Sequence, residues 1–139
     1  MIINGENLVM GRLASFTAQK LLKGEKIVIL NAEKAVINGN KELIYEKFKT
    51  RIDMTVKGNP HNSPKFPKFP DRIIKRSVRG MLPKRSKRGT EALKNLKVFI
   101  GVPKEFAEAK AEHLKMAEHK EGTQFIKLEQ LSRLLGANW

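Results

Sequence analysis

A basic, proline-containing segment in the middle of the chain limits how the whole sequence can fold. Residues 57–88 hold 11 of the 28 Lys and Arg residues but only one of the 14 acids, and they carry ten of the fourteen net positive charges. Like charges at this density repel one another, and a phosphate backbone would relieve that repulsion. We therefore expect residues 57–88 to be an exposed insertion on a body that the rest of the chain forms.

The position of the charge favours a nucleic acid as the partner. The sequence has a pI of about 10.2, and outside residues 57–88 the two signs nearly balance. A surface that serves only solubility normally intersperses both signs, so a solvated, charge-rich face is the weaker interpretation.

Composition limits the class of protein further. With 139 residues, 40% of them hydrophobic, the chain is expected to be a single domain, residues 1–139, with one core. The absence of cysteine excludes disulfides, thiolate metal sites and a cysteine nucleophile. No apolar run approaches the roughly 20 residues that cross a membrane, and no signal peptide is seen. We expect a cytoplasmic protein.

Short apolar runs alternate with amphipathic stretches on both sides of the basic segment. The predicted strands cover residues 2–3, 26–30, 35–37, 97–100 and 125–128. The predicted helices cover residues 11–23, 41–55, 71–79, 86–95 and 103–120, with a small one from about 131 to 136. Four prolines within residues 58–70 indicate an extended, polyproline-like stretch. The alternation predicts an α/β fold: three layers, α/β/α, with a central parallel sheet of about four strands and helices on both faces.

The first candidate binding motif is a row of cations in the predicted helix 71–79. It consists of Arg72, Lys75, Arg76 and Arg79. Spacings of three, four and seven put all four on one stripe, with Ile74 and Val78 towards the other side. A solvated helix face is the alternative. An anionic partner would, however, remove the repulsion among the four cations, and Arg can donate two parallel hydrogen bonds to phosphate oxygens.

Two neighbouring motifs extend this basic region. Lys84, Arg85, Lys87 and Arg88 are four cations in five residues beside a predicted helix start, and they form the strongest phosphate-binding candidate. In residues 65–70, Lys65 and Lys68 alternate with aromatic rings such as Phe66. These rings would either stack on unpaired bases or pin the loop to the body, and the sequence leaves both open.

A nucleotide-cofactor site has little support. Gly11 and Arg12 stand at a predicted helix start, where they could hold an RNA phosphate, but neither GxGxxG nor GxxxxGK[ST] is present. The three histidines do not have the spacing of a ligand set, and no catalytic base and nucleophile assemble. We expect no cofactor, no metal and no enzymatic activity.

Three blocks resemble a known family in order and spacing. They are residues 10–15 (MGRLAS), 31–37 (NAEKAVI) and above all 78–83 (VRGMLP), which continues through residues 87–89 to 96–101. The chain resembles ribosomal protein thirteen of the large subunit, in its archaeal form. The resemblance implies an α/β/α fold, no catalysis, and binding to large-subunit ribosomal RNA early in assembly. It implies RNA contacts at residues 79–83, at the adjoining cations as far as Arg88, and more weakly at Arg12. Thr90 departs from the family pattern, which usually has a larger polar residue there. The loop 58–70 is variable within the family.

These observations predict a structural ribosomal protein. Its partners would be large-subunit rRNA and neighbouring ribosomal proteins, with no membrane, small-molecule substrate or homo-oligomer. Two alternatives remain: a nucleotide-dependent enzyme on the same α/β scaffold, and a general RNA chaperone or DNA-compacting protein.

Overall fold

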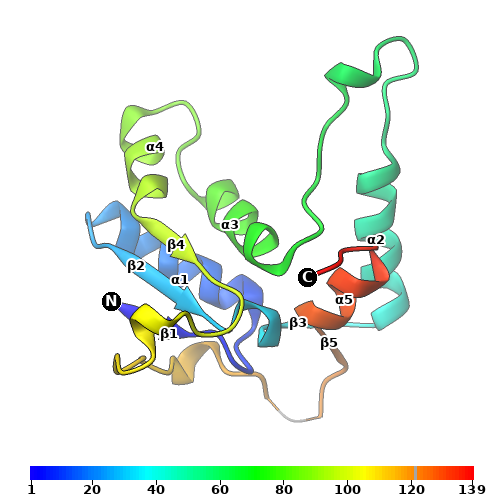
Figure 1. Cartoon of the computed structure of the whole chain (residues 1–139). Helices are drawn as coiled ribbons and strands as arrows, with labels where there is room; N and C mark the ends of the chain where they lie inside the picture. Colours follow the sequence, from blue (N-terminus) through cyan, green and yellow to red (C-terminus); the bar gives the residue numbers. More distant parts are fainter. Residues whose placement is uncertain (121) are drawn as a thin grey trace.

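A small parallel sheet forms the centre of the molecule. The computed structural model describes residues 1–120 and 122–139. Strands β1 (Ile2–Asn4), β2 (Ile27–Leu30) and β4 (Leu96–Val98) pair in parallel in the order β1-β2-β4 (Figure 1). In the register, Ile3 lies opposite Ile29, and Ile29 lies opposite Val98. A second sheet joins β3 (Val36–Asn38) and β5 (Phe125–Lys127) in antiparallel fashion.

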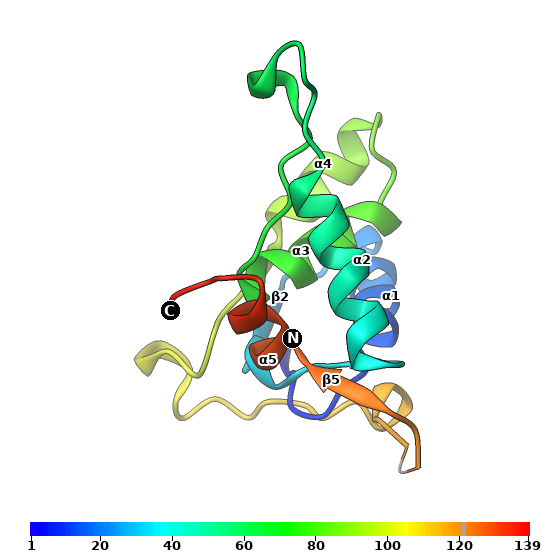
Figure 2. The same cartoon turned by 90° about the vertical axis from the view of Figure 1, so that its right-hand side faces the viewer.

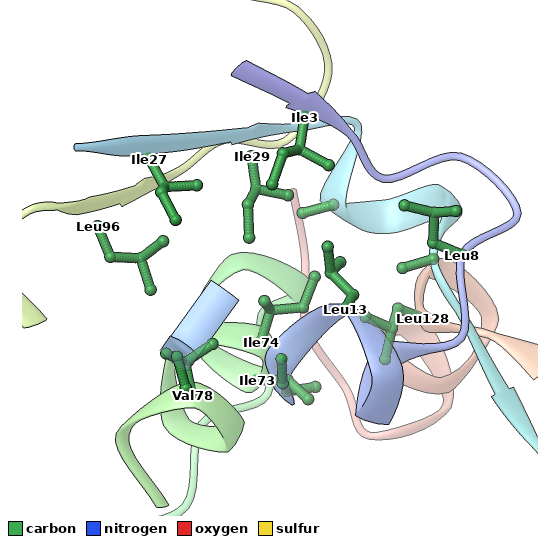
Figure 3. Packing of buried hydrophobic residues seen from close by; sticks show 14 of the residues in the cluster. Ile3, Leu8, Leu13, Ile27, Ile29, Ile73, Ile74, Val78, Leu96 and Leu128 are labelled. Atoms are coloured by element: carbon green, nitrogen blue, oxygen red, sulfur yellow. The ribbon is translucent and has the colours of Figure 1, made fainter. Parts of the chain in front are cut away.

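The core lies between the parallel sheet and two helices. These two helices are α1 (Met10–Leu22) and α3 (Pro70–Met81). The other α-helices of the described residues are α2 (Lys41–Asp53), α4 (Lys87–Lys94) and α5 (Leu128–Leu134). Figure 3 shows the inward sheet residues pointing towards α1 and α3. The buried side chains at this interface are Ile3, Ile27, Ile29 and Leu96 of the sheet, Leu13 of α1, and Ile73, Ile74 and Val78 of α3. Burial of these apolar side chains fixes α3, and with it the basic segment, on the body.

The predicted α/β class with a parallel sheet is confirmed, but the sheet has three strands and not about four. Only five residues separate β2 from β3, whereas a parallel crossover needs about a dozen. Asn31, with φ of 53°, precedes a short 3₁₀ turn (Ala32–Lys34) directly after β2, so the chain leaves the parallel sheet before β3. Strand β3 then pairs with β5 and not with the main sheet.

The helices that touch the sheet collect on one face. Helices α1 and α3 cover the inner face of the sheet. On the outer face, Ile2 and Val28 are half-buried and Lys97 is exposed. The expected helical cover of both faces is therefore not seen in residues 1–120 and 122–139. A sheet of three short strands has a narrow outer face, and a charged residue already occupies part of it.

The predicted helix over residues 103–120 is wrong. The segment holds two isolated 3₁₀ turns, Lys104–Phe106 and Lys115–Ala117, joined by extended chain. The Glu112 N–H donates to the Ile2 carbonyl at 2.8 Å, and the Asn4 N–H donates to the Glu112 carbonyl at 3.0 Å. The segment thus pairs with the open edge of β1, and these backbone bonds override the helix propensity of its Ala, Glu and Lys residues.

Candidate nucleic-acid interface

Helix α3 separates the core from the basic surface. Ile73, Ile74 and Val78 on its apolar side are buried. The predicted row of four cations, Arg72 to Arg79, lies on the other side, and all four side chains are exposed. The helix begins at Pro70, one residue before the predicted start, because proline suits the first helical position. Its end is Met81, so Gly80 lies inside the helix and does not end it.

The turn after α3 carries the second group of predicted cations. Leu82 is 5% exposed and anchors the turn in the core. The Ser86 hydroxyl accepts from the Arg88 N–H at 3.2 Å and caps α4. Lys84, Arg85, Lys87 and Arg88 are all exposed. A guanidinium nitrogen of Arg88 also donates to the Leu22 carbonyl at 3.1 Å, which ties the turn to the end of α1.

Gly89 allows this turn to close, and its replacement should destabilise the protein. A Cβ at residue 89 would lie 2.1 Å from the Pro83 carbonyl oxygen, a backbone atom that cannot move without moving the turn. We expect Gly89→Ala to reduce the free energy of unfolding by about 1–3 kcal/mol, the usual range for overpacking. Thermal or urea unfolding measures this effect. An unchanged midpoint would mean that the turn adapts freely.

An aromatic loop is pinned against α3. The Arg76 guanidinium lies 3.9 Å from the centroid of the Phe66 ring and donates to the Lys65 carbonyl at 3.2 Å. The Lys68 carbonyl accepts from the buried Ser132 hydroxyl of α5 at 2.8 Å. The half-buried Phe66 ring therefore packs the loop against the body, which is one of the two roles that the sequence left open for these rings. Lys65 and Lys68 keep exposed side chains.

Cations from three segments converge on one notch beside α3. Its lining consists of Pro64, Lys65, Arg76, Arg79, Gly80 and Lys84, around about 360 Å³. The four cations come from the aromatic loop, from α3 and from the turn after it. Among the described residues no acid lines this notch, so these residues leave its positive charge uncompensated. A phosphate group is the ligand that such a site fits best.

The predicted cations have no carboxylate partners in the part of the chain that the structure describes. Ion pairs there form elsewhere, between Lys20 and Glu25, Lys34 and Glu6, and Arg133 and Glu129, and the His113 ring lies 3.6 Å from a Glu118 carboxylate oxygen. Arg12 is exposed but is not brought to the notch, because it donates to the Glu118 carbonyl at 3.3 Å on another side of α1. It stands apart from the other predicted contacts.

Sequence reasoning missed the contribution of α2. Lys47 and Arg51 line a hollow between α2 and α3 that also includes Arg76 and Phe66. Their spacing of four residues, with Phe48 between them, is the signal that could have identified this face.

The place where open parallel sheets bind nucleotides is filled by the protein itself. Ligands of such sheets bind beyond the carboxyl ends of the strands. Here the Asn31 amide donates to the Asn4 side-chain oxygen at 2.9 Å, and the Gly101 N–H donates to the Glu33 carboxylate at 2.9 Å. Gly5 packs so closely that a Cβ would lie 2.9 Å from the Leu30 carbonyl oxygen. This packing argues against a cofactor site. No helix in residues 1–120 and 122–139 is both long and apolar enough to span a membrane.

Comparison with known proteins identifies the family. The family model described as Ribosomal protein L13 matches residues 1–105. The chain belongs to the ribosomal protein L13 family. Archaeal relatives carry the name Large ribosomal subunit protein uL13, and three of them show the extent of the match. The relative from Methanosphaera stadtmanae is 48% identical, over 99% of this chain and 98% of its own length. The relative from Archaeoglobus fulgidus is 41% identical, over 97% of this chain and 86% of its own length. The relative from Methanococcus maripaludis is 38% identical, over 100% of this chain and 99% of its own length.

Membership of the L13 family confirms several predictions. The resemblance seen in residues 10–15, 31–37 and 78–83 is correct, and so is its archaeal form. The relatives are named as proteins of the large ribosomal subunit, which agrees with the predicted ribosomal location in the cytoplasm and with the prediction that the chain is a structural protein. The relatives match almost the whole chain, so the irregular segment after residue 105 belongs to the archaeal L13 form as well.

Proposed function

We propose that this L13-family chain is a structural constituent of the large ribosomal subunit that binds and stabilises large-subunit rRNA. Residues 1–139 would act as one domain, with residues 57–88 as its rRNA-binding insertion. The relatives are named as large-subunit proteins, which supports the location. Binding early in assembly is part of the proposal, because a basic insertion of this kind neutralises phosphates that must lie close together in the finished subunit.

One observation carries the proposal. Eleven predicted cations are exposed and lack a carboxylate within 4 Å in the described residues, and eight of them lie on α3, the turn behind it and the start of α4. The proposed contacts are Arg72, Lys75, Arg76, Arg79, Lys84, Arg85, Lys87 and Arg88, with Lys65, Phe66 and Lys68 of the loop and Arg12 of α1. The mutual repulsion of these cations in the free protein is relieved when phosphates lie between them.

Most contacts should be to the RNA backbone. The cations point outward from a rigid helix and a capped turn, and A-form helices are recognised mainly through shape, phosphates and 2′-hydroxyls. The notch formed by Lys65, Arg76, Arg79 and Lys84 is the place where a single phosphate would have the most charged neighbours. Neighbouring ribosomal proteins are the second proposed class of partner.

The direct test is whether the native protein stays with the large subunit. We expect it to co-sediment with that subunit on a sucrose gradient after a high-salt wash. Affinity for free rRNA falls with salt, but in the assembled subunit many contacts to folded rRNA must break at the same time before the protein can leave. Immunoblotting of the gradient fractions measures this. Recovery mainly at the top of the gradient, or with the small subunit, would contradict the proposal.

A further inference from the structure

A second hollow lies next to the notch that Lys65, Arg76, Arg79 and Lys84 line. It runs between α2 and α3 and encloses about 390 Å³ (Figures 1 and 2 show the two helices). Its apolar lining includes Ile44 and Phe48 of α2, Ile73 of α3, and Phe66 of the loop. We call this hollow the α2–α3 groove.

The edge of the α2–α3 groove is cationic. Lys47 and Arg51 of α2 and Arg76 of α3 line it, and no acid in residues 1–120 or 122–139 does. Arg76 and Gly80 line both this groove and the notch, so the two hollows meet along α3. An aromatic hollow can bind a base, and the adjoining cationic notch can bind the phosphate of the same nucleotide.

No contact among the described residues requires glycine at residue 80. It is exposed within α3, and a Cβ built on it would meet no atom within 4 Å. Gly80 is the next-to-last residue of α3 and its φ is not positive, so the backbone does not require glycine there, and alanine would favour the helix more. Gly89, by contrast, is required by the nearby Pro83 carbonyl. A partner whose backbone passes directly over α3 would account for the missing side chain at residue 80.

We propose that the α2–α3 groove binds the base of one unpaired rRNA nucleotide, whose phosphate occupies the adjoining notch while its ribose crosses α3 at Gly80. This inference rests on the proposed rRNA-binding function and adds a base-binding site to it. Phe48 and Phe66 supply the apolar and aromatic surface for the base, and Lys47, Arg51 and Arg76 hold the flanking phosphates. A nucleic acid fits better than an apolar protein segment, because the latter would leave three cations uncompensated at the edge.

Substitutions at Gly80 give the first test. We expect Gly80→Ala to raise the melting temperature of the free protein slightly and Gly80→Leu not to lower it, since the site is open. Affinity for deproteinised large-subunit rRNA in a filter-binding assay should fall with side-chain size, by about tenfold for leucine, because the added atoms occupy the path of the ribose. Equal affinity of Gly80→Leu and the unchanged protein would overturn the proposal.

Ring removal in the groove gives the second test. Phe48→Leu keeps an apolar side chain but lacks the ring, and should weaken rRNA binding by about tenfold, the range of one base–aromatic stack. Phe16→Leu, which changes a half-buried ring on α1 outside the groove, is the matched control and should bind normally. Ultraviolet cross-linking of the protein–rRNA complex, followed by mass spectrometry, should place one nucleotide on a peptide that contains Phe48 or Phe66.

The outcomes separate this inference from the function on which it rests. If the unchanged protein fails to bind rRNA, the proposed function fails. If it binds, yet Phe48→Leu and Gly80→Leu bind equally well and no cross-link reaches Phe48 or Phe66, only the base site is refuted. Normal binding of Phe48→Leu to naked rRNA, together with its loss from assembled subunits, would assign the groove to a neighbouring protein and also refute the base site.

Discussion

Reversing Arg79 and Lys84 together to glutamate should lower the affinity for large-subunit rRNA by about 100-fold or more. Both side chains line the notch, and neither has a hydrogen-bond or carboxylate partner within the described residues. Removing one partner of a desolvated charge pair costs about 2–5 kcal/mol, and each glutamate adds repulsion with the phosphate that arginine or lysine had attracted. Filter binding or a gel-shift titration at fixed salt measures the change.

The same double variant should melt at nearly the unchanged temperature. Both positions are exposed, and their side chains bury nothing in the core. The matched control is Lys104→Glu with Lys110→Glu. Both lysines are exposed, and their reversal changes the net charge by the same amount outside the proposed surface. A similar loss of binding in the control would assign the effect to overall charge. A parallel loss of binding and folding would make Arg79 and Lys84 structural residues.

Arg76 is a poorer choice for this experiment, although it also lines the notch. Its guanidinium stacks on Phe66 and donates to the Lys65 carbonyl, so it holds the aromatic loop as well as offering charge. Reversal of Arg76 would release the loop and mix two effects. The contact with Phe66 and the hydrogen bond also restrain the Arg76 side chain before any RNA binds, which reduces the entropy cost of binding.

The parts of the site that depend on local pattern were predictable from the sequence. Ile74 and Val78 are four residues apart and therefore lie on one side of α3, while the four cations lie on the other. This spacing alone predicts which side of the helix is buried. Pro83 and Ser86 likewise mark the end of one helix and the start of the next. These signals placed the exposed cations correctly without any knowledge of tertiary contacts.

The parts that depend on contacts between distant residues were not predictable. Residues 103–120 have the composition of a helix, but bonds to Ile2 and Asn4, more than a hundred positions away, decide their conformation. The pairing of β3 with β5 similarly joins residues about ninety positions apart. The α2–α3 groove belongs to this class too, since the sequence of α2 indicates only an amphipathic helix, and none of its residues is fully buried.

Binding should depend steeply on salt. If about 6–10 phosphates are contacted, affinity for rRNA should fall by about 10³–10⁵ between 50 and 200 mM monovalent salt, because each contact releases condensed counterions. This slope applies to DNA duplexes and is shallower on single strands. A nucleotide-dependent enzyme would instead bind NAD or ATP saturably, with little response to salt. The required measurement is a series of dissociation constants over that salt range.

Neutralising variants show which cations meet the phosphates. Arg79→Gln with Lys84→Gln should reduce the slope of log affinity against log salt by about two, because each substitution removes one cation that neutralises a phosphate. Lys104→Gln with Lys110→Gln should leave the slope unchanged, since those lysines lie outside the proposed surface. A steep slope that both pairs leave intact would mean that other cations meet the RNA. Equal affinity and slope on duplex DNA would favour a general nucleic-acid chaperone, because only a fixed arrangement of cations distinguishes folded rRNA from any other polyphosphate.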